Sequence, residues 1–484
     1  MTAKPLSTLQ RSHLARYSDR LPALYGEGGR WVRLPAMKAF LATATVVVLA
    51  GTALSGQPPA ATVFEGAQVI VGDGRAPIER GAFVVQKGRV TAVGERGSVR
   101  VPSNATRVDL TGKTVMPAIV NAHVHLGFQR GAMFAAESYT RDNILDQLNR
   151  YAFAGVAAVL SLGTDPAPIP DTIRAAQRDG TLGGALFRIA GRGIAPPDAG
   201  PANAAMKPSA YGVRTEQEAR AAVRDEAARG VDVIKIWVDD RNGSVPKLSP
   251  ELARAVIDEA RRHKLKVIAH IFYLDDAKWL ARAGVNGFAH LVRDREADDE
   301  LVTLMRDNGV VIIPNMAISQ NGMFAAPPDW LDDPLFRAVT PAEDAERIRA
   351  SFSGRNPQAV ERAAATFRGM QRSVARMKAA GVKFAFGTDA GAVRDHVHAF
   401  TDHRELEIMV GAGLTPMEAI AAATSGSAEL VGLTDLGALT PGKSADFIVL
   451  DASPLEDIRN TRRIAGVYLR GGKIDREALV RTRR

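Results

Sequence analysis

The chain has 484 residues, of which 46% are hydrophobic and 24% charged, enough for a globular barrel of about 250 residues or more with an accessory domain. It contains no cysteine, which excludes disulfides, thiolate metal ligands and cysteine nucleophiles. The formal net charge is +9, but residues 1–56 contribute +5 of it through seven basic and two acidic side chains. The remainder is close to neutral, so its charge gives no reason to expect nucleic acid as a partner.

A leader-like segment precedes the globular part. Residues 39–64 are uncharged and include the apolar run FLATATVVVLAGTALSG, directly after Met37 and Lys38. Residues 37–57 therefore read as a secretory signal peptide, and residues 1–36 as an upstream extension or a mis-assigned start. An uncleaved N-terminal anchor is the alternative, because ~18 apolar residues are near the lower limit for spanning a bilayer. We expect export to the periplasm or the cell exterior, with membrane attachment only if the leader is retained.

Short β-type runs separated by glycine turns come next, at residues 62–71, 81–86, 89–94 and 106–110. The same pattern returns near the end of the chain, at residues 446–450 and 464–469. We predict that residues 62–114 and 437–475 together build a small flanking β-sandwich domain.

An apolar run over residues 115–126 carries two histidines near its end, His123 and His125. The run is too short for a helix and rich in β-branched residues, which predicts a buried strand. In extended backbone, residues i and i+2 point to the same face, so both imidazoles should converge at the end of the strand. Two convergent imidazoles are half of a zinc-type site; two unconnected surface histidines are the alternative.

Seven further apolar runs alternate with predicted helices. The runs span residues 156–162, 185–190, 231–237, 266–272, 287–291, 310–314 and 383–386. The helices are predicted at residues 141–151, 215–229, 249–262, 274–283, 295–308, 341–380 and 415–423, with capping boxes that open at Thr215, Thr340 and Thr415. Eight strands alternating with helices predict an α/β fold, a (β/α)8 TIM barrel over residues 115–436. A doubly wound open sheet is the alternative, but no Gly-x-Gly-x-x-Gly follows an early strand.

Two long connections, residues 191–214 and 315–333, are rich in Gly, Pro and Ala. They are predicted to be either flexible lids over the barrel mouth or surface excursions.

Ligand-type side chains mark four more of the apolar runs. Lys235 lies inside the fourth, His270 and His290 end the fifth and sixth, and Asp389 follows the eighth. A buried ammonium is unfavourable unless it is paired, so Lys235 must either reach the rim or be neutralised, for example as a carbamate. The carboxyl ends of barrel strands meet on one face, where catalytic groups gather. The sequence therefore predicts that these side chains join His123 and His125 there.

With these motifs the chain resembles the amidohydrolase superfamily over almost all of residues 62–472. The resemblance rests on the His-x-His after MPAIVNAHVH, the strand-four lysine, the histidines on strands five and six, the GTDAG aspartate and the closing LGALTPGKSADFIVLD segment. The most similar branch contains imidazolonepropionase-like and Xaa-Pro dipeptidase (prolidase)-like proteins.

The resemblance implies a binuclear metal centre with zinc as the first candidate. The implied ligands are His123, His125 and Asp389 for one ion, His270 and His290 for the second, and carboxylated Lys235 as the bridge. Two such cations lower the pKa of a bridging water and polarise the scissile carbonyl. The implied reaction is attack of the bridging hydroxide on a C–N amide or peptide bond, with Asp389 moving the proton.

One difference between this sequence and the deaminase-type relatives indicates which type of reaction to expect. Deaminase-type relatives use one metal ion and a Glu shortly after the strand-five histidine, whereas here Ile271, Phe272 and Tyr273 follow His270. This difference and Lys235 favour a two-metal hydrolase of an N-acyl amino acid or an Xaa-Pro-type dipeptide. The alternatives are a cyclic amide or lactone hydrolase with the same metals, a mononuclear deaminase-type enzyme and a non-catalytic exported binding protein. The last would predict a missing ligand, and all six positions are intact.

Other side chains are weaker candidates for contact with the substrate: Tyr273, Arg293 and His398, with His396, Trp237 and Asp239 nearby. Tyr273 could also donate to the developing oxyanion, and a core aromatic is the alternative. Arg293 could bind a substrate carboxylate, and a surface ion pair is the alternative. His396 and His398 form a second His-x-His, but on a loop that lacks strand geometry. The expected partner is a small amide or dipeptide, and homo-oligomer formation is left open.

Residues 437–444, GALTPGKS, match the phosphate-loop pattern letter for letter. A phosphate loop follows a strand and opens a helix, whereas this segment contains Pro441 and leads into a predicted strand. Nucleotide binding is therefore rejected. A serine hydrolase is also disfavoured, because the chain has no Gly-x-Ser-x-Gly elbow.

Overall fold

The computed structural model describes residues 61–481. The predicted leader and the segment before it lie outside the described residues, so export and anchoring stay predictions. Within residues 61–481, no helix is both long enough and apolar enough to cross a bilayer.

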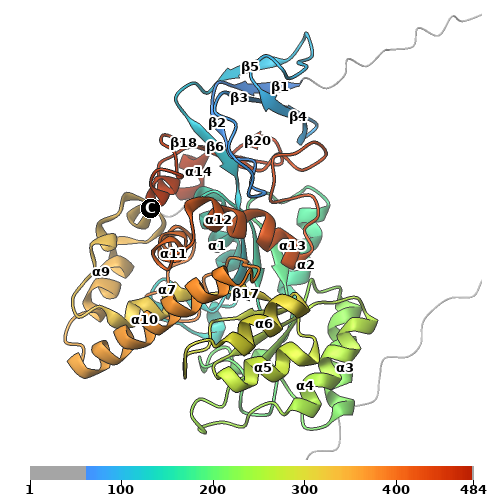
Figure 1. Ribbon diagram of the computed structural model, residues 1–484, viewed down its shortest axis with the longest axis vertical. Helices are drawn as coiled ribbons and strands as arrows, with labels where there is room; N and C mark the ends of the chain where they lie inside the picture. Colours follow the sequence, from blue (N-terminus) through green and yellow to red (C-terminus); the bar gives the residue numbers. More distant parts are fainter. Residues whose placement is uncertain (1–60, 482–484) are drawn as a thin grey trace, which may run out of the picture. The chain divides into compact units, whose positions relative to one another are not determined.

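Parallel strands surrounded by helices form a barrel (Figure 1). Its strands are β7 (Ile119–Val124), β10 (Val156–Ser161), β11 (Leu186–Ile189), β14 (Ile234–Val238), β15 (Val267–Ile271), β16 (Gly287–Ala289) and β17 (Val311–Ile313). β10 pairs with β7 and β11, and β14 to β17 pair in chain order. The two groups meet where Asp232 N donates to Ile189 O at 2.9 Å. The TIM-barrel fold expected from the sequence is confirmed.

The eighth position of the barrel is an extended segment, residues 384–390, without a regular ladder. It bridges Ile312 of β17 near its start and Val124 of β7 at its end. Ser427 replaces part of the ladder, because its hydroxyl accepts from Phe386 N at 2.8 Å and donates to Phe386 O at 3.1 Å. The segment therefore closes the barrel and remains free to turn sharply at its end.

Helices cover the outside of the barrel: α1 (Arg141–Phe153), α2 (Ile169–Arg178), α3 (Glu216–Arg229), α4 (Pro250–Arg262), α5 (Leu274–Ala283), α6 (Asp299–Asn308), α10 (Pro357–Ala379) and α11 (Phe400–Gly411). Several start where a side chain can cap them. The hydroxyls of Thr140, Thr215 and Ser249 each accept a backbone N–H from the first turn that follows. Local capping chemistry thus sets the starts of α1, α3 and α4.

The helix predicted over residues 341–380 is wrong in one respect, because it is two helices, α9 (Ala342–Ser351) and α10. Gly354 between them has φ +69°, a left-handed conformation that ends a helix, and Pro357 opens the next one. The predicted cap at Thr340 is also wrong. Thr340 ends α8 (Pro334–Val339), and Pro341 precedes α9 without a side-chain cap.

The helix predicted over residues 415–423 begins as α12 (Pro416–Ala421), and Thr415 and Glu418 form the expected capping box. A π-helical turn, Ala422–Gly426, follows and leads into α13 (Ser427–Val431). This turn brings Ser427 to the eighth segment of the barrel.

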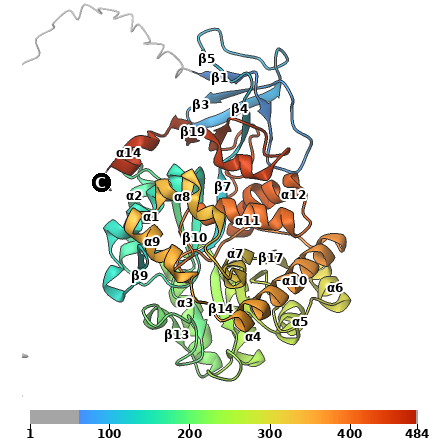
Figure 2. The same cartoon turned by 90° about the vertical axis from the view of Figure 1, so that its left-hand side faces the viewer.

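Two small sheets from the chain ends pack face to face. Their strands are β1 (Thr62–Glu65), β2 (Gln68–Val69), β3 (Gly81–Gln86), β4 (Arg89–Glu95), β5 (Thr106–Asp109), β6 (Thr114–Pro117), β18 (Phe447–Leu450), β19 (Ile464–Leu469) and β20 (Gly472–Lys473). One sheet has the order β4-β3-β1-β5 and the other β2-β6-β18-β19-β20. The Phe447 ring lies 5.0 Å from both Phe64 and Phe83 and 4.5 Å from Tyr468. These aromatic contacts join the two ends of the chain, at the top of Figures 1 and 2.

The two long connections contain ordered elements. Residues 191–214 carry β12 (Ile194–Ala195) and β13 (Tyr211–Gly212), and residues 315–333 carry α7 (Met316–Gln320). A short hairpin of β8 (Gln129–Arg130) and β9 (Met133–Phe134) follows β7, and α14 (Arg476–Arg481) ends the described chain.

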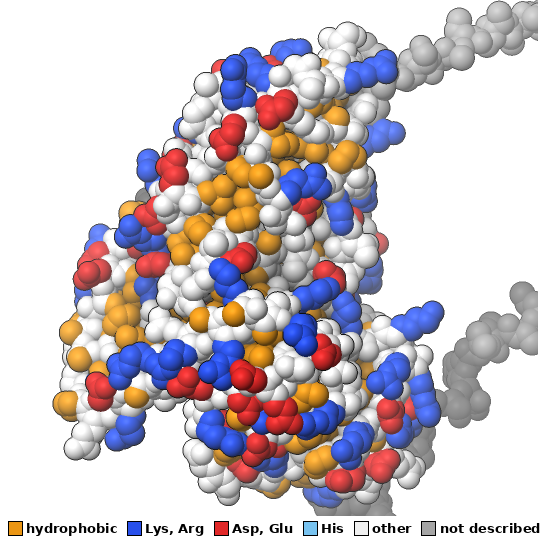
Figure 3. Space-filling view, viewed as in Figure 1, with side chains coloured by type: hydrophobic (Ala, Val, Ile, Leu, Met, Phe, Trp, Pro, Cys, Tyr) orange, Lys and Arg blue, Asp and Glu red, His pale blue; other side chains and the backbone are white. Residues whose placement is uncertain are grey.

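Acidic and basic side chains are interspersed on the face shown in Figure 3. On α5 and beside it, Lys278 lies 2.5 Å from Asp298 and 2.7 Å from Glu300, and Arg282 also pairs with Glu300. The Arg282–Glu300 pair is about half exposed on both sides, and exposed pairs of this kind contribute little stability individually.

We expect Phe447→Ala to lower the free energy of unfolding by about 3–5 kcal/mol, because it empties a fully buried aromatic position shared by both small sheets. Urea unfolding monitored by circular dichroism measures the loss. Val393→Ala, at a side chain that is 37% exposed, is the control and should change stability by less than about 0.5 kcal/mol. A loss below about 1 kcal/mol for Phe447→Ala would contradict a shared core.

Candidate metal centre

The barrel brings all six predicted ligand positions to one end. His123 ends β7 with His125 just beyond it, Lys235 lies on β14, His270 on β15, and His290 follows β16, while Asp389 ends the eighth segment. Because these strands are parallel, their carboxyl ends meet on the same face of the barrel. The period-2 argument for His123 and His125 agrees with this arrangement.

The Asp389 carboxylate lies at the centre of the group. Its Oδ1 is 3.2 Å from His123 Nε2 and 3.0 Å from His125 Nε2, and its Oδ2 is 3.7 Å from His290 Nε2. The His270 ring lies 4.6 Å from the His290 ring, centre to centre. One ligand atom each from His123, His290 and Asp389 lies within 4.8 Å of the others, close enough to hold a single ion.

Hydrogen bonds at the outer nitrogens set the tautomers of two histidines. His123 Nδ1 donates to Asn315 Oδ1 at 2.9 Å, whereas His125 Nδ1 lies 2.8 Å from the Thr164 hydroxyl, which can either accept or donate. His270 uses the opposite nitrogen, and its Nε2 donates to Asp239 Oδ2 at 3.0 Å. A neutral imidazole with one nitrogen protonated carries its lone pair on the other, which is the form that binds metal.

Burial favours the neutral form of His123, His270 and His290. It lowers the pKa of His123 and His290 well below the usual value and that of His270 to about 4. Burial by itself would raise the pKa of Asp389, whereas positive charge at His123, His290 and His125 and a hydrogen bond from His125 lower it well below its usual range, so the carboxylate is stabilised only when a cation lies among these rings. Neutral imidazoles around an ionised carboxylate are the donor set of a divalent metal site.

Lys235 is the unusual member of the group. Its side chain is 1% exposed, and no residue within 61–481 forms a hydrogen bond with its Nζ. Burial lowers its pKa to about 7, although the Asp389 charge acts in the opposite direction. Lys235 therefore does not reach the rim, and a large fraction of it is the neutral amine at neutral pH.

Two glycines make room for the lysine. A Cβ on Gly163 would lie 2.7 Å from Lys235 Cγ, and a Cβ on Gly193 would lie 2.2 Å from the Trp237 ring and 3.0 Å from Lys235 Cγ. Any side chain at either position would displace the lysine stem or the indole. This close approach explains glycine after β10 and before β12.

Three residues at the site have left-handed backbone: His290 with φ +74°, Asn315 with φ +50° and Asp389 with φ +59°. Such conformations cost non-glycine residues roughly 1–3 kcal/mol each and persist only where the surroundings hold them. The Asn315 side chain supplies part of that support, because its Oδ1 accepts from His290 N at 3.1 Å.

The predicted substrate contacts lie in different surroundings. The Tyr273 hydroxyl donates to Asp240 at 2.6 Å, so its proton points to a rim loop, and a catalytic role for Tyr273 stays a prediction. His398 is buried and its Nε2 donates to His125 O at 3.0 Å, which supports the metal-ligand strand; contact with substrate stays a prediction. His396 is also buried, and neither ring nitrogen has a hydrogen-bond partner in the described part of the chain.

Arg293 lies beside the metal centre. Its charge contributes to lowering the pKa of both His270 and His290. One guanidinium nitrogen donates to Ile271 O at 2.9 Å, while its buried Nε has no partner among residues 61–481. No carboxylate in that range lies within 4.0 Å of it, so the alternative of a surface ion pair is not what the structure contains.

Sequence reasoning missed several supporting residues: Asn121, Thr164, Asn315, Asp402 and Glu405. Asn121 interrupts the apolar run before His123, and Asn315 follows the strand at residues 310–314, so both had the same signal as the ligands, a polar residue at a strand end. Asp402 and Glu405 lie on a helix that the sequence-based prediction omits.

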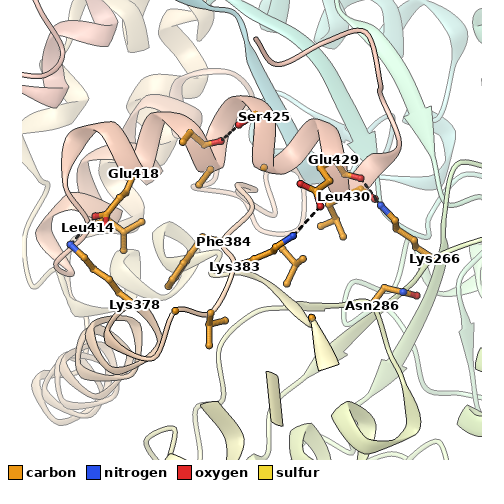
Figure 4. Close-up of a pocket in the computed structure, with 17 residues that line it drawn as sticks. Lys266, Asn286, Lys378, Lys383, Phe384, Leu414, Glu418, Ser425, Glu429 and Leu430 are labelled. Atoms are coloured by element: carbon orange, nitrogen blue, oxygen red, sulfur yellow. Dashed lines mark hydrogen bonds and ion pairs between the residues drawn. The ribbon is translucent and has the colours of Figure 1, made fainter. Parts of the chain in front are cut away.

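A cavity of about 510 Å³ lies at the opposite end of the barrel (Figure 4). It is lined by residues that precede the strands, among them Lys266 and Lys383. Lys383 is 3.1 Å from Glu429, Lys378 is 2.7 Å from Glu418, and Lys266 donates to Glu429 O at 2.5 Å. Each of these lysines therefore has a carboxylate or carbonyl partner within the protein.

We expect Lys235→Met to stabilise the metal-free, bicarbonate-free protein by about 4 kcal/mol at pH 7 and about 1 kcal/mol at pH 9.5. The pKa of Lys235 is lowered in the folded state, so the unfolded state binds more protons between pH 7 and 10.5. The penalty for burying this lysine is therefore largest below pH 7 and fades as pH rises. Denaturant unfolding at both pH values measures it, with exposed Lys383→Met as control. An equal effect at both pH values would contradict the lowered pKa.

Comparison with known proteins agrees with this site. The amidohydrolase family model matches residues 114–474. An ochratoxinase from Aspergillus niger is 27% identical over 277 residues, 53% of this chain and 49% of that protein, so the match spans about half of its length. An imidazolonepropionase from Nocardia farcinica is 28% identical over 395 residues, 79% of this chain and 88% of that protein. A solved Xaa-Pro dipeptidase with bound methionine in the active site has a TM-score of 0.67 at 25% identity, covering 86% of this chain and all of that one. The chain belongs to the amidohydrolase family.

Proposed function

We propose that this protein is a binuclear metal-dependent hydrolase that cleaves the C–N bond of an N-acyl amino acid or an Xaa-Pro-type dipeptide. His123, His125 and Asp389 would hold one divalent ion, and His270 and His290 the second. Carboxylated Lys235 would bridge the two. Zinc is the first candidate, because imidazole nitrogens predominate among the ligands.

The observation that carries the binuclear proposal is Lys235. Burying an amine without a hydrogen-bond partner is unfavourable, so Lys235 needs a role that offsets this cost. Its pKa of about 7 leaves much of the amine neutral, and the neutral amine is the form that reacts with carbon dioxide to give a carbamate. The resulting carbamate is an anion, and two cations beside it would compensate its burial. A single-metal site would leave Lys235 without a role.

The metal ions and the residues of the site would have separate roles in the proposed reaction. Metal ions bound here would lower the pKa of a water and polarise a carbonyl. Asp389, held as a carboxylate at the centre of the ligands, can take up a proton and return it to the leaving amine. His290 and His270 remain neutral and leave that proton to Asp389.

Arg293 is the proposed anchor for the substrate carboxylate. It is a cation beside His270 and His290 with a buried, unpartnered Nε, and no acidic side chain of the described range lies within 4.0 Å of its guanidinium, although the charges of Asp239 and Asp389 act on it from farther away. An arginine in that state is suited to a carboxylate ligand. A free amino acid, methionine, is the ligand named for the related Xaa-Pro dipeptidase structure, which supports an amino acid as the product released here.

We expect protein purified in bicarbonate to contain about two divalent ions per chain, and Lys235→Ala to lose at least one of them with most of its activity. Elemental analysis measures the metal, and a panel of N-acyl amino acids, Xaa-Pro dipeptides, cyclic amides and lactones measures hydrolysis. Lys383→Ala, exposed and distant from the ligands, is the matched control. One ion per chain that persists in Lys235→Ala would refute the binuclear site and favour a deaminase-type enzyme.

We expect Arg293→Met to lower kcat/KM by roughly 10- to 150-fold for the best substrate with a free carboxylate. The same substrate with its carboxylate amidated should lose little, because the lost contact is charge-assisted. Arg295→Met removes an exposed guanidinium, paired with Asp275 at 2.7 Å, and is the control. An equal loss on both substrates would show that Arg293 acts on the fold rather than on the carboxylate.

A further inference from the structure

Helix α11 carries two fully buried carboxylates, Asp402 and Glu405, three residues apart. Residues at i and i+3 lie on the same helix face. Neither side chain forms an ion pair with a lysine or arginine within residues 61–481, so ionic compensation does not explain their burial. Each instead accepts hydrogen bonds that lead to the metal centre.

Glu405 holds the turn that begins α7. Its two oxygens accept from Met316 N at 2.7 Å and Ala317 N at 2.6 Å. These amides directly follow Asn315, whose left-handed backbone aims its side chain at the ligands. Asn315 Oδ1 accepts from His123 Nδ1 at 2.9 Å and His290 N at 3.1 Å. One carboxylate thus supports the orientation of two ligand residues.

Asp402 acts through the other asparagine. Its Oδ1 accepts from Asn121 Nδ2 at 2.8 Å, and the same amide group donates to Thr388 Oγ1 at 3.0 Å. Asn121 Oδ1 accepts from His123 N at 2.9 Å. Burial raises the pKa of Asp402 to about 8, so at neutral pH it is mainly the neutral acid, which an asparagine resembles in shape and polarity.

The two arms meet at His123. The arm from Glu405 fixes its ring and the arm from Asp402 fixes its backbone, while Thr388 connects the second arm to the residue before Asp389. Helix α11 is itself anchored on its far side, because buried His403 bonds Ala154 O and Thr461 Oγ1, each at 3.0 Å. α11 also packs directly on α7 (Figure 2).

We propose that Asp402 and Glu405 are positioning residues, and that α11 sets the geometry of the metal centre through Asn121 and Asn315. The inference rests on the metal site of the proposed function. Outer hydrogen-bond partners of metal ligands typically change metal affinity 10- to 100-fold when they are removed. Here the partners of His123 are two asparagines, and two acidic side chains of one helix orient both.

Binding of Co²⁺ tests the proposal, with the visible spectrum of the bound ion as a report on ligand geometry and chelator competition as a measure of affinity. Glu405→Gln keeps the shape but can accept only one of the two amides, so we expect roughly 10-fold or greater loss of affinity and an altered spectrum. Glu226→Gln is the control, because Glu226 is also buried and accepts a backbone N–H, from Arg192 at 3.1 Å, outside both arms. It should alter stability without altering the spectrum.

A double-variant cycle checks the route. Asn315→Gly removes the side chain while tolerating φ +50°, so it should reproduce the spectral change of Glu405→Gln, and the double variant should lose little more affinity than Asn315→Gly alone. Additive losses would overturn the route through Asn315.

Asp402 gives a second test, also if Glu405→Gln does not fold. Asp402→Asn should bind Co²⁺ as the wild type does, because its amide oxygen still accepts from Asn121, whereas Asp402→Leu should lose affinity and change the spectrum. Wild-type spectra and affinities in both Glu405→Gln and Asp402→Leu would reduce α11 to a structural role. A wild-type protein that does not bind Co²⁺ would instead refute the metal site itself.

Discussion

The outer nitrogen of each histidine determines what its inner nitrogen can do. An imidazole in a water-poor barrel end stays neutral, and a neutral ring has one donor and one acceptor. Asn315 and Asp239 each accept the donor of one ring, so the lone pairs of His123 and His270 remain available. The same ring atoms could not bind a metal if those partners were absent and the protons moved inward. The metal centre therefore depends on polar residues that never contact the metal.

The segment that closes the barrel also positions a residue of the metal centre, Asp389. The eighth segment keeps backbone hydrogen bonds to both neighbouring strands, among them Ala385 N to Ile312 O at 2.9 Å and Asp389 N to His123 O at 2.8 Å, and the chain turns at Asp389 in left-handed backbone. The turn brings Gly391 so close to His125 that a Cβ would lie 1.9 Å from the His125 carbonyl oxygen. His398 donates to that same carbonyl. The backbone hydrogen bonds between Asp389 and His123 and between His125 and Ala390 thus place the central carboxylate beside these histidines.

The parts of the fold with a strong local period could be predicted from the sequence. Apolar runs that end in His, contain Lys235 or precede Asp389 identified the strands. The rule that the ends of parallel strands meet on one face then brought the six predicted ligand positions together. Helix α11 could not be found in this way, because buried residues, among them Asp402, His403 and Glu405, surround it and leave no clear apolar stripe. The roles of Asn121 and Asn315 depend on that helix. Substrate contacts depend on loop geometry, and the spacing of apolar residues that predicts helices and strands carries no information about loop geometry.

Lys235 connects stability with function. Its amine lies in the barrel without a hydrogen-bond partner from the described residues. Because its pKa is lower in the folded than in the unfolded state, burial of this amine lowers the free energy of unfolding at neutral pH. Gly163 and Gly193 leave space for the lysine, so the surrounding chain is shaped to keep it rather than to expel it. A well-packed hydrophobic side chain would stabilise the metal-free fold better at this position. The barrel nevertheless retains an unpaired lysine beside a cluster of imidazoles and one carboxylate, a position that the stability of the metal-free fold does not explain.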